Sequence, residues 1–177
     1  NILTAGIIDI ENAAGFTNQG HIRGSKATLK TRELSNEGTI RVKSSEESPE
    51  GVRPSLTIEA HNGQNSGTLR AEGAIDIHFS EQLENSGDIL SGKGLTFESQ
   101  GHLINEGLFE SERSISLKVA KLENAGRVLA KQDVDGSFDP REPRNTSSVD
   151  FTNRGLILGQ NVGLNFVKGT SRCLLKN

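Results

Sequence analysis

Short stretches in which apolar and polar residues alternate recur along the whole chain, and this alternation has the period of a β-strand. The clearest apolar pairs are Ile75 and Ile77, Leu95 and Phe97, and Ile115 and Leu117. The residues between the members of each pair, Asp76, Thr96 and Ser116, are polar and are expected to point outward. No segment of useful length has the i, i+3, i+4, i+7 spacing of an amphipathic helix. The pattern therefore predicts an all-β protein built from short strands.

A second motif, Asn-x-Gly, precedes these pairs at a nearly fixed distance. Its copies lie at Asn18 and Gly20, Asn36 and Gly38, Asn65 and Gly67, Asn85 and Gly87, Asn105 and Gly107, Asn124 and Gly126, and Asn153 and Gly155. Successive copies are 18, 29, 20, 20, 19 and 29 residues apart. We interpret Thr4 to Gly6 as a degenerate earlier corner, because Ile2 and Ile8 flank it as apolar residues flank the others. A period near twenty residues indicates a solenoid.

Each unit is expected to contain two short strands separated by corners that contain glycine. Neither strand can bury its apolar side alone, so we predict that equivalent strands of successive units stack in parallel around a continuous apolar interior. This arrangement is a parallel β-helix with coils of about 20 residues. The corner glycine is expected to provide a positive φ. The corner asparagine can bond to the backbone of its turn, or to the asparagine of the next coil as an amide ladder, and the sequence leaves both uses open.

The composition agrees with a narrow solenoid. The 177 residues include no Met, Trp or Tyr, and only 32% are hydrophobic, whereas a globular core of this size normally uses more aromatic residues. The net charge of −3 gives no general attraction to nucleic acid or to an anionic membrane, and we expect no nucleic-acid partner. No apolar stretch is long enough to span a bilayer.

The chain is expected to form a single β-helix segment over residues 1–177, interior to a longer protein. Two of the intervals between corners have about nine extra residues, and we assign these to insertions at residues 44–54 and 135–148. All four prolines of the chain fall in these two stretches, and proline cannot donate to a strand ladder. The insertions are either binding loops or insertions that the repeat tolerates.

One basic stripe is a candidate binding surface. Arg23, Arg41 and Arg70 each lie five residues after a corner asparagine, so the stacked fold predicts that they form a stripe over three coils. Such a stripe could contact an anionic polysaccharide or a lipid head group, or it could be an ordinary solvated face. Leu90 ends the stripe, and Glu110 reverses its sign.

Other residues give no sign of catalysis. His21, His61, His78 and His102 occupy four different places in the repeat and do not have the spacing of metal ligands, so we interpret them as surface residues. No nucleophile, base and orienting group are recognisable together around any serine or around Cys173, the only cysteine. We predict no catalytic residues, no metal site and no cofactor.

The run Leu-x-Asn-x-Gly-x-Ile, with its alternating strand, resembles the haemagglutinin repeats of large secreted bacterial exoproteins. The residues that carry the resemblance are Leu34 to Ile40, Leu83 to Ile89, Leu103 to Phe109 and Leu122 to Val128. That family includes filamentous haemagglutinins and the stick regions of contact-dependent growth inhibition toxins. The resemblance implies a right-handed parallel β-helix, exported by an outer-membrane two-partner transporter to the bacterial cell surface.

From these observations we expect a structural and adhesive rod segment of a secreted surface exoprotein that is not an enzyme. Its partners would be the transporter during export and a receptor or glycan on a host or neighbouring cell. One alternative is a β-helical polysaccharide lyase or hydrolase, with residues 44–54 as a lid beside the arginine stripe. Another is the stalk of a contact-dependent toxin delivery protein, which would share the same fold.

Overall fold

The computed structural model describes residues 1–4, 6–44, 46, 50–138, 150–166 and 172–175. The described residues form twenty strands and no helix, and all strand pairings among them are parallel. Because parallel strands need a crossover, each strand pairs with the equivalent strand one coil away rather than with its neighbour in sequence. The prediction of a parallel β-helix is confirmed.

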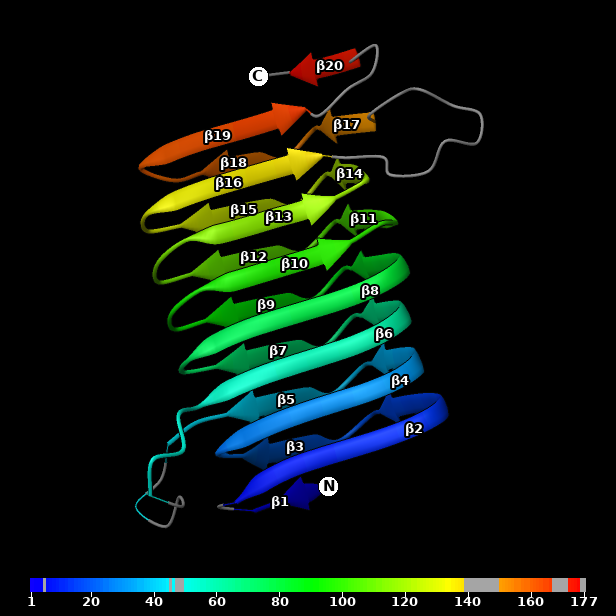
Figure 1. The fold of residues 1–177 in the computed structure, drawn as a ribbon, viewed down its shortest axis with the longest axis vertical. Coiled ribbons are helices and arrows are strands. Elements are labelled where there is room, and N and C mark those ends of the chain that lie inside the picture. The colour runs from blue at the N-terminus through cyan, green and yellow to red at the C-terminus, as the bar shows by residue number, and fades with distance from the viewer. Residues whose placement is uncertain (5, 45, 47–49, 139–149, 167–171, 176–177) are drawn as a thin grey trace.

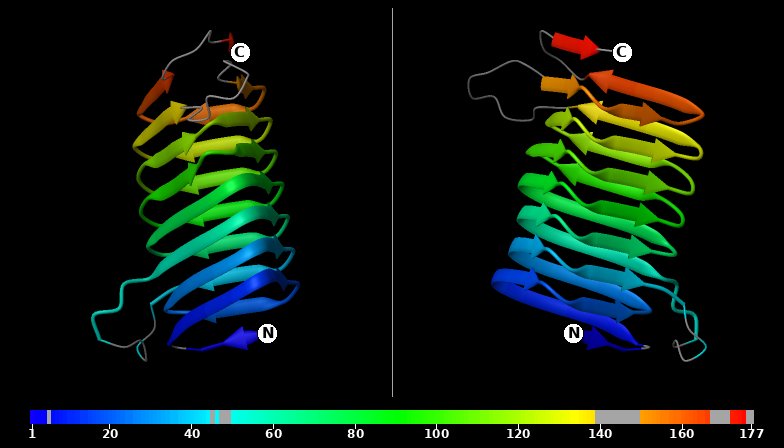
Figure 2. Two further views of the ribbon diagram at one scale, coloured as in Figure 1. Left: turned by 45° about the vertical axis from the view of Figure 1, so that its right-hand side comes forward. Right: turned by 180° about the vertical axis from the view of Figure 1, so that it is seen from behind.

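An eight-stranded sheet forms one wall of the rod. In stacking order it contains β1 (Ile2–Leu3), β3 (His21–Gly24), β5 (Thr39–Val42), β7 (Thr68–Ala71), β9 (Asp88–Ser91), β12 (Leu108–Ser111), β15 (Arg127–Ala130) and β18 (Leu156–Leu158). Figure 2 shows this sheet from behind, with its strands one above another along the length of the molecule.

A twelve-stranded sheet forms the remaining walls. Its front wall contains β2 (Ile7–Asn18), β4 (Lys26–Asn36), β6 (Ser55–Asn65), β8 (Ala74–Asn85), β10 (Leu95–Ser99), β13 (Ile115–Val119), β16 (Asp133–Phe138) and β19 (Asn161–Phe166). The first four of these strands bend and continue into a short third wall. Separate strands continue that wall, namely β11 (His102–Asn105), β14 (Lys121–Asn124), β17 (Asp150–Asn153) and β20 (Arg172–Leu175).

The coil is right-handed. In Figure 1 the front strands rise from left to right, and the chain returns from right to left through the eight-stranded sheet behind them as it advances upward. This is the handedness that the resemblance implied, and it is the usual one for parallel strands joined by a crossover.

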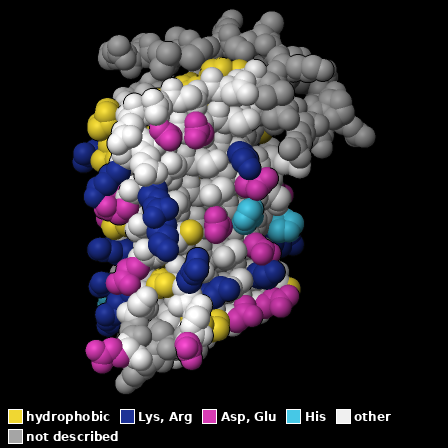
Figure 3. Space-filling view, turned by 60° about the vertical axis from the view of Figure 1, so that its left-hand side comes forward, with side chains coloured by type: hydrophobic (Ala, Val, Ile, Leu, Met, Phe, Trp, Pro, Cys, Tyr) yellow, Lys and Arg dark blue, Asp and Glu magenta, His cyan; other side chains and the backbone are white. Residues whose placement is uncertain are grey.

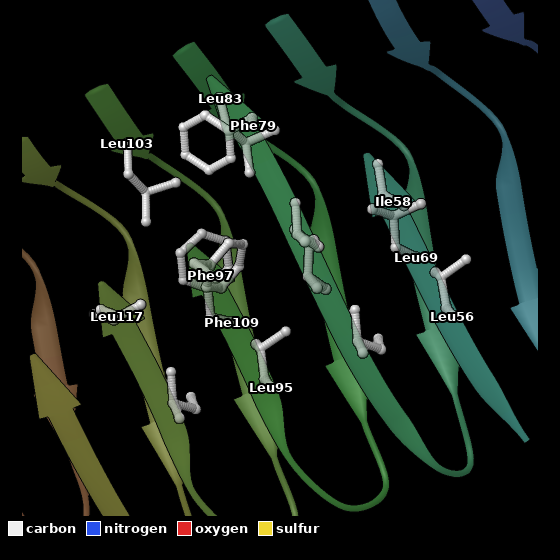
Figure 4. Packing of buried hydrophobic residues seen from close by; sticks show 14 of the residues in the cluster. Leu56, Ile58, Leu69, Phe79, Leu83, Leu95, Phe97, Leu103, Phe109 and Leu117 are labelled. Carbon is white, nitrogen blue, oxygen red and sulfur yellow. The ribbon is translucent and has the colours of Figure 1, made fainter. Parts of the chain in front are cut away.

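Columns of aligned apolar side chains fill the interior. One column on the front wall consists of Ala27, Leu56, Ile75, Leu95, Ile115 and Val134, and all six are completely buried or nearly so. A neighbouring column places Ile58, Ile77, Phe97 and Leu117 over one another, and Figure 4 shows Phe97 facing Phe109 from the opposite wall. Burial of each such side chain contributes about 1.5–3 kcal/mol relative to exposure. The polar residues between the columns, Asp76, Thr96 and Ser116, point outward as predicted.

The second predicted insertion starts too early. Strand β16 runs to Phe138 and pairs with β13 and β19, so residues 135–138 belong to the front wall; residues 139–148 lie outside the described residues. The first, at residues 44–54, falls between β5 and β6, and its residues 45 and 47–49 are not described.

The interpretation of Thr4 to Gly6 as an earlier Asn-Gly corner is wrong. Ile2 pairs with Ile22, and Ile22 lies four residues after the corner residue Asn18. Thr4 and Gly6 therefore come after the corner position of their own coil. The Thr4 N–H donates to the Arg23 carbonyl at 3.0 Å, and the Ser25 N–H donates to the Gly6 carbonyl at 2.9 Å. Thr4 and Gly6 therefore belong to the other turn, which joins the eight-stranded sheet to the front wall.

Candidate functional site

The corner asparagines form one continuous amide ladder inside the rod. The Nδ2 of each asparagine donates to the Oδ1 of the asparagine on the next coil, over distances of 2.6–2.9 Å. The series runs Asn18, Asn36, Asn65, Asn85, Asn105, Asn124 and Asn153. The first six side chains are buried, and Asn36 and Asn105 are completely so. A buried amide without partners is costly, so this ladder is what allows a polar side chain at each corner.

The asparagines also bond to the backbone, so both uses that the sequence left open are realised. The Nδ2 of Asn85 donates to the carbonyl of Gly87 in its own turn at 2.9 Å. The backbone carbonyl of Asn85 accepts two N–H groups of the next coil, from Glu106 at 2.8 Å and from Gly107 at 3.0 Å. The same backbone pattern recurs at the carbonyls of Asn18, Asn36, Asn65, Asn105 and Asn124.

The corner glycines are required for a reason that differs from the prediction. None of them has a positive φ; among the described glycines only Gly51 does. Instead, a Cβ on Gly87 would lie closer than 3.0 Å to the backbone carbonyl oxygen of Gly67 one coil below, and Gly107 has the same relation to Gly87. From Gly38 onward the corners stack too closely for any side chain at this position, because backbone atoms of the coil below occupy the space.

The arginines of the predicted stripe lie on successive coils. Arg23 on β3 pairs in register with Arg41 on β5, and Arg41 pairs with Arg70 on β7. All three side chains are exposed on the outer face of the eight-stranded sheet. Thr39 and Thr68 pair directly beside them on the same face. The binding role of this arginine stripe (Arg23, Arg41 and Arg70) stays a proposal.

A second row of charged residues, which the sequence analysis missed, lies in a groove of about 850 Å³ on the front wall. This charge row consists of Lys30, Glu59, His78, Glu98 and Lys118, which pair in register from β4 to β13. Lys30 Nζ lies 3.1 Å from Glu59 Oε2, and His78 Nδ1 lies 3.8 Å from Glu98 Oε2. Figure 3 shows histidine side chains beside acidic ones on this part of the surface.

Lys30 and Glu59 in this row stabilise the stack, since a pair of opposite charges facing each other on adjacent strands contributes about 0.2–1 kcal/mol. A signal for the charge row was present in the sequence: His78, Glu98 and Lys118 each lie 13 residues after a corner asparagine. The histidines do not stack on one another, but His78 lies between two carboxylates. The lyase or hydrolase alternative placed residues 44–54 as a lid beside the arginine stripe, and no described residue of that segment lines this groove.

A smaller cluster lies on the third wall. Glu123 Oε1 lies 2.7 Å from Lys121 Nζ and 3.3 Å from His102 Nε2. The hydrogen bond from Lys121 is the main cause that lowers the pKa of Glu123 below its usual value, and the charges of Lys121, His102 and Arg154 act in the same direction against desolvation. The cluster is a network of polar and charged groups at the surface.

Within the described ranges, no group of three or more His, Cys, Asp or Glu residues could hold a metal ion. The part of the chain that the structure describes also contains no helix that could cross a membrane.

Three proteins named CdiA are similar in sequence to this chain. The chain is 33% identical over 84 residues to Toxin CdiA of Escherichia coli, and 33% identical over 84 residues to tRNA nuclease CdiA of E. coli strain NC101. These matches cover 47% of this chain and 3% and 2% of the relatives. It is 28% identical over 146 residues to tRNA nuclease CdiA of E. coli strain 536, a match that covers 76% of this chain and 4% of that protein.

The chain therefore spans only 2–4% of the length of the curated relatives it matches. No protein-family model matches it, and no solved structure matches it. The sequence similarity to CdiA and the β-solenoid fold both agree with the predicted haemagglutinin-type repeat region.

Proposed function

We propose that this chain is a rod segment of a secreted contact-dependent inhibition protein, and that it holds a more distal part of that protein away from the cell. The observation that carries the proposal is the amide ladder, which runs unbroken through seven corners. A stack joined by backbone pairs at every coil distributes an axial load along its length. Similarity to proteins named CdiA supports the same function.

The proposal includes three partners, namely a transporter, a receptor and an anionic attachment partner, and it includes no catalytic step. An outer-membrane two-partner transporter would export the segment to the bacterial surface, and a receptor on a neighbouring or host cell would meet the distal tip. The arginine stripe is the surface that we assign to direct attachment, because three exposed guanidinium groups suit an anionic partner.

A chimaera tests the rod function. This chain would replace the matching stretch of E. coli CdiA, and inhibition of susceptible neighbouring cells would be counted in co-culture. We expect inhibition to be retained, and we expect it to be lost with Gly87→Ala, which breaks the corner stack. Gly94→Ala serves as the control, because nothing lies within 4 Å of a Cβ there. A chimaera that is displayed at full length and does not inhibit would disprove the proposal.

The enzyme alternative has its own test. Acidic polysaccharides incubated with the chain should keep their length in a reducing-end assay. Sustained cleavage that Glu59→Gln abolishes would instead assign catalysis to the groove.

A further inference from the structure

The outer face of the eight-stranded sheet has two halves with different chemistry. On β3, β5 and β7 it carries the arginine stripe with its threonine neighbours. On β9, β12, β15 and β18 the same outward positions carry five leucines together with Asp88, Glu110 and Arg127. We call these leucines the leucine patch: Leu90, Leu108, Leu129, Leu156 and Leu158. Leu156 and Leu158 are 44% and 56% exposed, and the other three are half-buried.

Outward leucines occur on this wall and are absent from the equivalent outward row of the front wall. The equivalent outward row of the front wall consists of Thr28, Thr57, Asp76, Thr96 and Ser116. Outward threonine and serine are what a solvated strand normally carries, and a group of exposed apolar residues on one face marks a contact surface. The leucine patch continues the arginine stripe along the rod, because Arg70 pairs with Leu90.

The arginine half is also unusual in its electrostatics. Like charges facing each other on adjacent strands destabilise a sheet, and this wall places three in succession. None of the three guanidinium groups has a carboxylate within 4.0 Å among the described residues. The carboxylates in the outward rows of this face, Asp88 and Glu110, lie in the leucine half. The stripe therefore keeps its charge available for an anionic partner.

We propose that this face lies against an anionic lipid surface, with the arginines at the phosphates of the head groups and the leucines in the upper apolar layer. The inference rests on the proposed function, because it names the partner of the attachment surface. An arginine near an anionic leaflet favours binding by about fivefold, and apolar side chains beside it add to the affinity. The net charge of −3 is no obstacle, since the arginines and the leucines share the outer face of one sheet.

Two other occupants fit the face less well. A polysaccharide would use the arginines, but leucines offer it no hydrogen bonds, and the chain has no Trp or Tyr on which a sugar ring could stack. A second copy of the chain would cover the leucines, but on this face it offers only Asp88 and Glu110 as outward carboxylates against three arginines. An anionic lipid surface is the occupant that uses both halves.

Flotation with vesicles tests the proposal. The 177-residue chain would be mixed with vesicles of equal parts phosphatidylglycerol and phosphatidylcholine, and with vesicles of phosphatidylcholine alone. We expect flotation with the anionic vesicles only. The triple variant Arg23→Thr, Arg41→Thr, Arg70→Thr should bind at least tenfold more weakly at low salt. The double variant Leu156→Thr, Leu158→Thr should lose affinity severalfold with no change of charge.

A matched control removes three positive charges from the other sheet: Lys26→Thr, Arg32→Thr, Lys118→Thr should float like the unaltered chain. Circular dichroism would show that each variant keeps its strands. The single variants Arg41→Thr and Leu158→Thr give smaller losses and replace a multiple variant that fails to fold.

Four outcomes would overturn the proposal. The first is no flotation of the unaltered chain, and the second is an equal loss in the front-wall control. The third is retention on heparin that needs the arginines but not the leucines, without vesicle binding, which identifies a polysaccharide. The fourth is a dimer in light scattering that the leucine variant abolishes, again without vesicle binding. A chain that restores inhibition in the CdiA chimaera but does not float disproves this inference alone, whereas one that floats but does not inhibit disproves the rod function alone.

Discussion

The coils before Ser91 and the coils after it reach the same Asn-Gly corner by different backbone routes. In the first region, β4, β6 and β8 run for 11 or 12 residues and bend from the front wall into the third wall without a break. In the second region, the same path is divided into β10 and β11, and into β13 and β14. The asparagine ladder passes through both regions with the same geometry. Register is therefore fixed by the corner and not by the continuity of the strand.

The two regions also fill their interior differently. Before Ser91 the columns are mainly aliphatic, and Phe79 has no ring neighbour in the described ranges. After it, aromatic rings meet across the walls: Phe97 lies 4.5 Å from Phe109, and Phe138 lies 5.2 Å from both Phe151 and Phe166, measured between ring centroids. The interior accepts either packing because each coil contacts chiefly the coils beside it.

The largest expected effect tests the corner itself. Gly87→Ala should lower the free energy of unfolding by about 4 kcal/mol, because the new Cβ overlaps the Gly67 carbonyl and backbone cannot move aside cheaply. Urea denaturation would measure the loss. Gly94→Ala, which has open space around its Cβ, should change stability by under about 1 kcal/mol. Equal losses in the two variants would show that the corner has no special role.

A smaller loss of stability is expected when one asparagine of the ladder is replaced, and this loss can be compared between the two regions. Asn65→Ala and Asn105→Ala should each cost about 2–3 kcal/mol, because each removes the ladder partner of one buried amide N–H and of one buried amide oxygen on the neighbouring coils. Denaturation of both variants by urea is the measurement. A clearly larger loss at Asn65 would mean that the long bent strands depend on the ladder more than the divided ones do.

The aromatic packing gives a difference of about 1 kcal/mol. Phe138→Leu removes contacts to two rings, whereas Phe79→Leu removes a ring that contacts none among the described residues. Aromatic pairs contribute about 0.5–1.5 kcal/mol beyond burial, so Phe138→Leu should lower the midpoint of thermal unfolding further than Phe79→Leu does. Equal midpoints would contradict this reason for the difference.

The smallest effect is that of pH at Glu123. The pKa of this carboxyl is lowered in the folded chain, mainly by Lys121, so its contribution to stability is present above the unfolded value of about 4.3 and is lost as the pH falls through the folded value. Because the side chain is 44% exposed and screened by solvent, Glu123→Gln should cost only a few tenths of a kcal/mol at neutral pH. That cost should vanish in acid.

The matched control for this prediction is Glu84→Gln on β8. Glu84 occupies the equivalent position two coils earlier, but uncharged Gln82 takes the place of Lys121 there. Unfolding of the unaltered chain and of the two variants would be followed at neutral and at acid pH. A cost at Glu123 that persists in acid would rule out the ion pair as its cause.

Much of the fold could be predicted from the sequence, because in a solenoid local spacing determines which residues meet. The five-residue offset of Arg41 and Arg70 from their corners was enough to place them on adjacent rungs. The reason that position 87 must be glycine could not be predicted from the sequence. A close approach between coils and a positive φ both require glycine, so they give the same sequence pattern. Thr4 was wrongly predicted to begin an Asn-Gly corner for a similar reason, because apolar residues flank both turns of a coil.

The candidate surfaces were predicted only in part. The arginine stripe repeats one residue type, so it is visible in the sequence. The charge row of the front wall alternates in type, and its members are recognised only when the stacking partner is known. The leucine patch was missed because Leu108 and Leu156 are apolar like the core residues beside them, and only the pairing shows that they face outward.

The amides of the asparagine ladder all point the same way. Each Nδ2 donates toward the C-terminal coil, from Asn18 through to Asn153, so the column is polarised and every added member reinforces the others. A newly arriving turn on that side meets an N–H that is already oriented to receive its oxygen. The rod can thus grow by templating, from the N-terminal coil toward the C-terminal one.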